Sequence, residues 1–231
     1  MAEKLEARGL VRPSLFTFYG RHLTAWHCIK TLLHSKQGGR VVDFGSGPIE
    51  PAILMSVVGD DCLSFAAFDG NQKVVELANR LNAGESVPVE EIAKTSVNFN
   101  DDGSPMENTD FAHDALTAHM DRFRRVFGIS PFKYENGLFT QTASQRHLSI
   151  FESNILDIFE PNDACLELLE DADVLYMGGL MVNLRRMVSE EALSDWLKNL
   201  RQHFHGTLVA GLTPLDLMKN NTLGLFEQCG F

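Results

Sequence analysis

The stretch Val41-Val42-Asp43-Phe44-Gly45-Ser46-Gly47-Pro48 decides the fold. A short apolar run with β-branched residues is typical of a buried strand, the glycines indicate a turn, and the apolar spacing over 49–58 is helical. Backbone that enters a helix through glycines can approach a ligand closely, and the first N–H groups of the helix favour negative charge. We therefore expect a binding site at Gly45 and Gly47.

The same alternation of strand and helix continues along the chain. It predicts further strands at 63–68, 148–151, 173–177 and 206–212, and helices at 72–81 and 189–204. Strands that alternate with helices of this length are typical of a parallel sheet. The sequence therefore predicts an α/β, Rossmann-like fold with a mostly parallel sheet and helices on both faces.

Two segments interrupt this alternation. Residues 1–37 precede the first strand and are apolar enough for a helical arm or lid. Residues 82–147 form an insertion before the third strand, with a helix expected over 109–127 and a hairpin turn at Asn136-Gly137. We expect residues 1–231 to form a single domain.

Composition restricts the class of protein. Of 231 residues, 44% are hydrophobic and 22% are charged, which is ordinary for a folded soluble domain. The net charge of −11 repels a phosphate backbone, which argues against a nucleic-acid partner. No apolar run reaches the ~18 residues of a membrane helix, and no signal pattern begins the chain, so we expect no membrane partner and a cytoplasmic location. The cysteines and histidines lack metal-ligand spacing, and we expect no metal site.

The acidic residue at the end of the second strand restricts the class of ligand that the site could bind. Asp69 ends that strand, where a carboxylate can accept two hydrogen bonds from a ribose diol. The turn is not a complete GxGxxG motif, because Glu50 stands at the third glycine position. A site for NAD and a site for S-adenosylmethionine would both use this geometry.

The turn, Asp69 with Gly70-Asn71, and Asn154-Ile155-Leu156-Asp157 together resemble the nucleotide site of class I S-adenosylmethionine-dependent methyltransferases, over about residues 38–212. Residues 45–51 look most like the glycine loop of nicotianamine synthases, and 173–182 is similar to their fourth strand. Those enzymes transfer the aminocarboxypropyl arm of S-adenosylmethionine. In the related azetidine-2-carboxylate synthases, the arm closes on its own amine and methylthioadenosine leaves.

The resemblance implies a set of site residues. It places Gly45 and Gly47 at the amino acid part of S-adenosylmethionine, Asp69 at the ribose, and Asn154 at the adenine edge or the arm. The binding residues that it implies are Asp43, Gly45, Ser46, Gly47, Asp69, Gly70, Asn71, Asn154, Ile155, Tyr19 and Trp26, and the catalytic residues are Asn154 and Tyr176. The family usually has antiparallel strands after the fifth, and the chain ends at 229–231, so we expect a shortened sheet.

Each assignment also has a purely structural interpretation: a tight turn at Gly45 and Gly47, a helix cap at Asp69, a loop amide bonded to its own backbone at Asn154, and packed core residues at Phe16, Tyr19, Trp26 and Tyr176.

The residues expected near the aminocarboxypropyl arm distinguish methyl transfer from ring closure. No base motif follows the fourth strand at 176–179, which disfavours methyl transfer to a poor nucleophile. Ring closure needs a neutral amine, and Asn154 and Tyr176 would hold the amine without adding negative charge. Phe16, Tyr19 and Trp26 could face the sulfonium.

The sequence therefore predicts cyclisation of S-adenosylmethionine, as the substrate, to azetidine-2-carboxylate and methylthioadenosine. The alternatives are a small-molecule methyltransferase and a catalytically inactive nucleotide-binding module. We expect a small-molecule substrate as the partner, and a homodimer stays open.

Overall fold

A computed structural model gives the structure of the chain. It describes residues 19–95, 98–99, 105–106, 121, 124–142, 147–159, 164–212 and 221–231.

The central sheet has five parallel strands in the order β10-β9-β1-β2-β8. They are β1 (Gly39–Phe44), β2 (Cys62–Asp69), β8 (Leu148–Glu152), β9 (Val174–Met177) and β10 (Thr207–Ala210). The chain moves outward from β1 through β2 to β8, and then returns to the other side of β1 with β9. Parallel sheets of this kind bind ligands at the carboxyl ends of the strands, where the order reverses. The predicted α/β, Rossmann-like fold with a parallel sheet and helices on both faces is confirmed.

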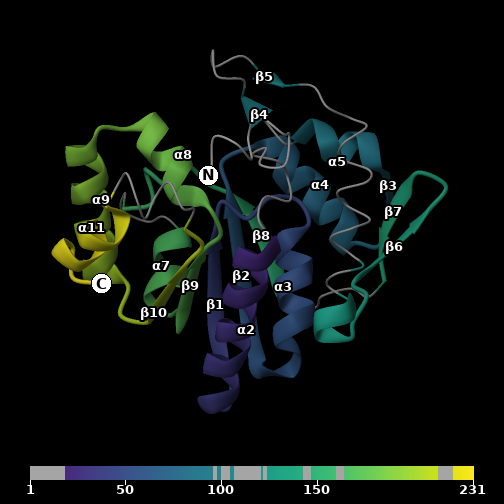
Figure 1. Cartoon of the computed structure of the whole chain (residues 1–231), viewed down its shortest axis with the longest axis horizontal. Helices are drawn as coiled ribbons and strands as arrows, with labels where there is room; N and C mark the ends of the chain where they lie inside the picture. The colour runs from purple at the N-terminus through teal and green to yellow at the C-terminus, as the bar shows by residue number, and fades with distance from the viewer. Residues whose placement is uncertain are drawn as a thin grey trace.

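Helices cover both faces of the sheet (Figure 1). One apolar core lies between the sheet and α2 (Tyr19–Ser35), α3 (Glu50–Val58) and α4 (Gln72–Asn82), with a short 3-10 turn at Gly59–Asp61 after α3. The second core lies on the opposite face, under α7 (Ala164–Glu170), α8 (Leu180–Met187), α9 (Glu190–His203) and α11 (Thr222–Gln228). The helices predicted after β1, after β2 and before β10 begin and end within two residues of α3, α4 and α9.

The predicted arm contributes a layer of the core. Trp26, Ile29 and Leu33 on α2 are fully buried, and α2 packs along α3. Trp26 therefore has the structural role that the sequence left as an alternative to a ligand contact. Phe16 and the side chain of Tyr19 lie outside the described residues.

The insertion forms a small sheet of its own. It contains β3 (Ser86–Pro88), α5 (Val89–Thr95), β4 (Asn98–Phe99), β5 (Pro105–Met106), β6 (Phe132–Glu135) and β7 (Leu138–Gln141). The strands β3, β7 and β6 pair antiparallel, and Asn136 and Gly137 turn the β6–β7 hairpin with positive φ, as predicted. Most of the helix expected over 109–127 lies outside the described residues.

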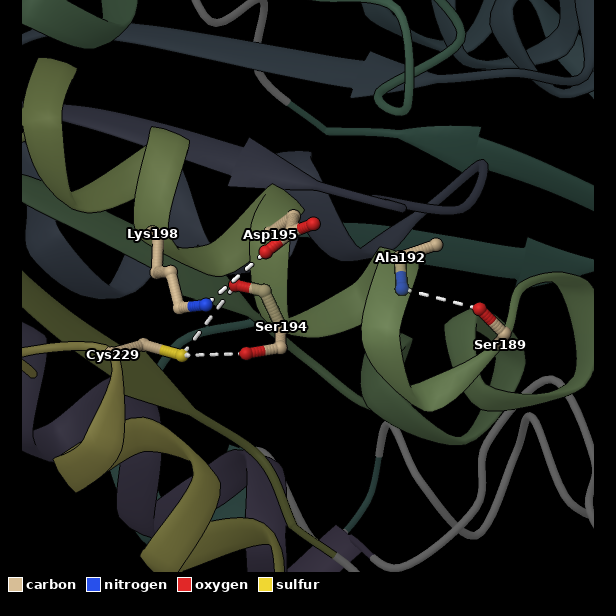
Figure 2. Close-up of polar contacts among 6 residues, drawn as sticks. All are labelled: Ser189, Ala192, Ser194, Asp195, Lys198 and Cys229. Carbon is tan, nitrogen blue, oxygen red and sulfur yellow. Dashed lines mark hydrogen bonds and ion pairs between the residues drawn. The ribbon is translucent and has the colours of Figure 1, made fainter.

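The C-terminal helix docks on α9 through a buried cysteine (Figure 2). The Cys229 Sγ atom lies 3.8 Å from the Ser194 hydroxyl and donates to the Ser194 carbonyl at 3.6 Å. Ser189 caps α9 by accepting from the Ala192 amide. In the described part of the chain after β10, α11 is present and no antiparallel strand follows. None of the described helices is long and apolar enough to cross a membrane.

Candidate functional site

The glycine turn after β1 is bonded tightly to the end of β2. Gly45 and Gly47 both have φ of +68°, which favours glycine. The amides of Gly45 and Ser46 donate to the Phe68 carbonyl at 2.8 and 3.2 Å. The Gly47 amide donates to Asp69 Oδ2 at 3.1 Å. All three amides therefore donate to acceptors within the protein. A ligand that lies against this loop would meet backbone atoms, but no unused N–H group from these three residues.

Asp69 joins the end of β2 to the loop. Its Oδ1 accepts from the Asn71 amide at 2.9 Å, while its Oδ2 accepts from Gly47. Burial raises the pKa of Asp69, and these two amide hydrogen bonds lower it in part. The helix α4 is capped by Asn71, whose side chain accepts from the Lys73 amide, so Asp69 is not its cap. Gly70 is not required by space, because an added Cβ would make only ordinary van der Waals contact, 3.7 Å from the Ser153 carbonyl.

Two further carboxyl groups lie beside the loop, and each has a buried oxygen without a hydrogen-bond partner among the described residues. The Asp43 residue is 1% exposed, and its Oδ2 atom has no partner. Glu50 begins α3, and its Oε2 atom is buried without a partner. A Cβ added to Gly47 would lie 2.7 Å from this Oε2. The sequence did contain a signal for Glu50. It stands where the GxGxxG dinucleotide-binding motif has its third glycine, so a carboxyl group at this position is a departure from that motif.

Burial, with a smaller contribution from neighbouring negative charge, favours the neutral forms of Asp43 and Glu50. Burial raises the pKa of Asp43 well above its usual value, and the charges of Glu50 and Asp69 raise it further. Burial raises the pKa of Glu50 to about 8, against the hydrogen bonds of the Ile49 and Glu50 amides, which lower it. Desolvation disfavours a charged form that no cation balances, and none of the ion pairs between described residues includes these three groups.

Tyr176 lies next to Asp43 in the sheet. The two residues are register partners on the parallel strands β9 and β1, so their side chains leave the same face. The Tyr176 hydroxyl lies 2.6 Å from Nδ1 of His22 on α2, and both residues are buried. The phenol also lies under the turn after β9, where a Cβ on Gly178 would come within 2.8 Å of its oxygen. Sequence reasoning missed His22, because 154 positions separate it from Tyr176.

The structure does not bring Asn154 together with Tyr176. Asn154 follows β8, which is three strands away from β9 in the sheet, a separation of about 14 Å at the usual strand spacing. Its exposed side chain donates to Asp157 at 2.6 Å and accepts from the Leu156 amide at 3.3 Å. Asn154 therefore bonds within its own turn. Ile155 is a core residue whose carbonyl accepts from the Trp196 indole at 2.8 Å.

This arrangement suits a cation. Phosphate sites use free amides at a helix N-terminus, but here the protein's own acceptors take the amides of the loop and of Ile49 and Glu50, and Pro51 at the start of α3 has no N–H. A phosphate would also meet the carboxyl groups of Asp43, Glu50 and Asp69. Among the described residues, no group of histidine, cysteine, aspartate or glutamate side chains is arranged to hold a metal ion.

Comparisons with known proteins add little to this chemistry. No family model matches the chain, and no curated protein is similar to it in sequence. A precorrin 8W decarboxylase from Methanobacterium thermoautotrophicum aligns over 89% of this chain and 70% of its own, at 12% identity and a TM-score of 0.43. The arsenic(III) S-adenosylmethionine methyltransferase CrArsM from Chlamydomonas reinhardtii aligns over 84% of this chain and 52% of its own, at 14% identity and a TM-score of 0.39. Likeness at this level carries no argument about function, which rests on the residues described above.

Proposed function

We propose that the chain binds S-adenosylmethionine at the carboxyl ends of β1, β2 and β9 and closes its aminocarboxypropyl arm to azetidine-2-carboxylate, with release of methylthioadenosine. The observation that carries the proposal is the acidic site whose loop amides are already bonded. S-Adenosylmethionine brings a sulfonium and an ammonium group to these carboxyl groups. The pyrophosphate of NAD would bring two negative charges to the same place, so the site favours the sulfonium ligand over the dinucleotide.

The ribose belongs at Asp69. Each carboxylate oxygen of Asp69 accepts one backbone amide and keeps a second lone pair, so the group can also accept from the two hydroxyls of a ribose. Because these amides fix the carboxylate, the ribose contact costs little ordering of the side chain.

The ring closure balances without an added reactant. The α-amine loses one proton, and its nitrogen attacks the γ carbon of the same arm. The bond from that carbon to sulfur breaks, and its electron pair goes to sulfur, which becomes the neutral thioether of methylthioadenosine. A fixed negative charge would hold the amine protonated. The sulfonium charge of the bound ligand favours the ionised form of a carboxyl group whose pKa burial has raised, and a carboxylate with such a raised pKa can then take up the amine proton and become neutral.

Product analysis tests the proposal. The pure protein is incubated with S-adenosylmethionine alone, and the products are separated and identified by mass. We expect methylthioadenosine and azetidine-2-carboxylate in equal amounts, and slower formation of both with the Asp69→Ala variant at subsaturating S-adenosylmethionine. S-Adenosylhomocysteine that forms only after an acceptor is added would replace the proposal with methyl transfer. Binding without any product would favour the inactive nucleotide-binding module.

A further inference from the structure

We infer that Glu50 binds the α-ammonium group of S-adenosylmethionine and accepts its proton in the ring closure. This inference rests on the proposed function and names a residue that the resemblance to known families does not assign. It is carried by the position of one carboxyl group and by what its two oxygens contact.

The position of Glu50 is set by the loop that it supports. It is the first residue of α3, it is followed by Pro51, and its carboxyl group folds back beneath Gly47. Glycine suits the position above it, because φ there is +68° and an added Cβ would lie 2.7 Å from Oε2, so that the carboxyl group would have to move. The carboxyl group is therefore held at the turn between β1 and α3, at the point where the strand order reverses.

The unused oxygen points to a ligand. Asp69 uses both of its oxygens on backbone amides, whereas Glu50 Oε2 is buried and has no partner among the described residues. A buried acceptor without a donor is costly, and native proteins rarely keep one without a function. An ammonium group supplies up to three donors, and Asp43 Oδ2 is a second unused acceptor for it.

Proton transfer between these groups is nearly balanced in energy. Burial raises the pKa of Glu50 in the ligand-free protein to about 8, an ordinary α-amine also has a pKa of ~8, and the sulfonium charge of the bound ligand lowers both. An acid and a base with similar pKa values exchange a proton readily in either direction. The α-ammonium proton would pass to Glu50 Oε2, the nitrogen lone pair would form the new bond to the γ carbon, and sulfur would leave with the electrons of the broken bond.

The competing role for Glu50 is purely structural. Its carboxylate accepts from the Ile49 and Glu50 amides at the start of α3, so it could serve only as a helix cap. Glutamine keeps the size of the side chain and an oxygen acceptor for those amides, but it cannot take up a proton. Glu50→Gln therefore separates the two roles.

Truncation of the ligand provides the test. The affinities of S-adenosylmethionine and of methylthioadenosine, which lacks the arm and its amine, are measured by calorimetry at pH 7 for wild type and Glu50→Gln. We expect the variant to bind S-adenosylmethionine about 10-fold or more weakly, and methylthioadenosine within about 2-fold of wild type. Glu91→Gln removes an exposed carboxylate that pairs with Arg80, and it should change neither affinity.

Turnover gives a second readout. We expect methylthioadenosine formation to fall at least about 100-fold in Glu50→Gln, as for loss of a general base, and to recover in part in Glu50→Asp. If circular dichroism shows that Glu50→Gln does not fold, a measurement on the wild-type protein still tests the inference. Its preference for S-adenosylmethionine over methylthioadenosine should then fall when the pH is lowered from 8 to 6, since protonated Glu50 cannot accept from the ammonium group.

Equal weakening of both ligands in Glu50→Gln, or an unchanged affinity for S-adenosylmethionine, would overturn the inference and leave Glu50 as a helix cap. A pH-independent preference in the wild type would overturn it as well. These outcomes are distinct from failure of the proposed function. One such combination is a wild-type protein that makes S-adenosylhomocysteine and a Glu50→Gln variant that binds S-adenosylmethionine, but not methylthioadenosine, more weakly. That combination would keep the ammonium contact and reject the cyclisation.

Discussion

Carboxyl groups at the two ends of β1 differ in whether they have hydrogen-bond and ion-pair partners. At the amino end, Asp173 accepts from the Arg40 amide at 2.9 Å and lies 3.5 Å from the Lys36 ammonium, and Asp171 pairs with the Arg40 guanidinium at 2.6 Å. At the carboxyl end, Asp43 and Glu50 have buried oxygens without partners among the described residues.

This difference separates a structural use of acids from a functional one. The pairs at the amino end are half exposed, and such pairs change stability by at most about 1 kcal/mol. The acids at the carboxyl end lower stability when they ionise, because no cation compensates for their burial. We infer that the partner of these groups is a ligand, and the four predictions below test the contrast between the two ends.

The largest effect is expected from Asp69→Ala. Loss of charge-assisted hydrogen bonds to the ribose, worth ~1.5–3 kcal/mol, should weaken S-adenosylmethionine binding by about 10-fold to 150-fold. Asp171→Ala removes a carboxylate of the same type at the other end of β1 and should leave the affinity unchanged. Calorimetric titration of both variants measures the effect, and equal affinities would abolish the contrast between the two ends.

The second prediction concerns the glycine turn. Gly47 and Gly84 both have positive φ, so substitution by alanine should cost each a similar ~1–2 kcal/mol of stability. Only at Gly47 does the added Cβ meet a site residue, Glu50, whereas nothing lies within 4 Å at Gly84. We expect Gly47→Ala to weaken S-adenosylmethionine binding about 10-fold and Gly84→Ala to leave it unchanged. Matching affinities in the two variants would mean that Glu50 has no part in binding.

The third prediction concerns stability and pH. The pKa of Glu50 rises from 4.5 to about 8 on folding, so the folded state binds more protons than the unfolded state between these values. The stability of the ligand-free protein should therefore fall as pH rises from 4.5 to about 8. Glu50→Gln should remove part of this fall. The difference between its melting temperature and that of wild type should therefore become more positive as the pH rises from 4.5 to about 8. Parallel melting curves at every pH would show that Glu50 is not buried in the ligand-free protein.

The smallest effect is expected at the amino end. Arg40→Ala breaks the exposed pair with Asp171 and should cost about 0.2–1 kcal/mol at low salt, and less in 1 M salt. Denaturant unfolding at the two salt concentrations measures this cost. A loss above about 3 kcal/mol would mean that the pair is a major part of the core.

The sheet could be predicted from the sequence because its strands are local apolar runs, and all of them except β8 end at aspartate or just before glycine. The position of Asp69 at the end of β2 followed from the same local pattern. The order of the strands in the sheet depends on contacts that are not local, and it was not predicted from the sequence.

The parts of the site that could not be predicted depend on contacts over long distances or on the direction of one side chain. His22 reaches Tyr176 only because α2 packs on the sheet. Glu50 folds beneath Gly47 rather than toward solvent, and helical periodicity does not specify this for the first residue of a helix. Asn154 was expected at the arm, but the nearby Asp157 carboxylate and Leu156 amide satisfy its side chain.

The central claim is that the carboxyl end of β1 is a site for a cation that ionises buried acids when it binds. The most direct measurement is calorimetric titration of the wild-type protein with S-adenosylmethionine at pH 7 in two buffers of different ionisation enthalpy. We predict binding with net release of protons, because the ligand's positive charge lowers the raised pKa values of Asp43 and Glu50. An absence of binding, or binding with an enthalpy that is the same in both buffers, would contradict the claim.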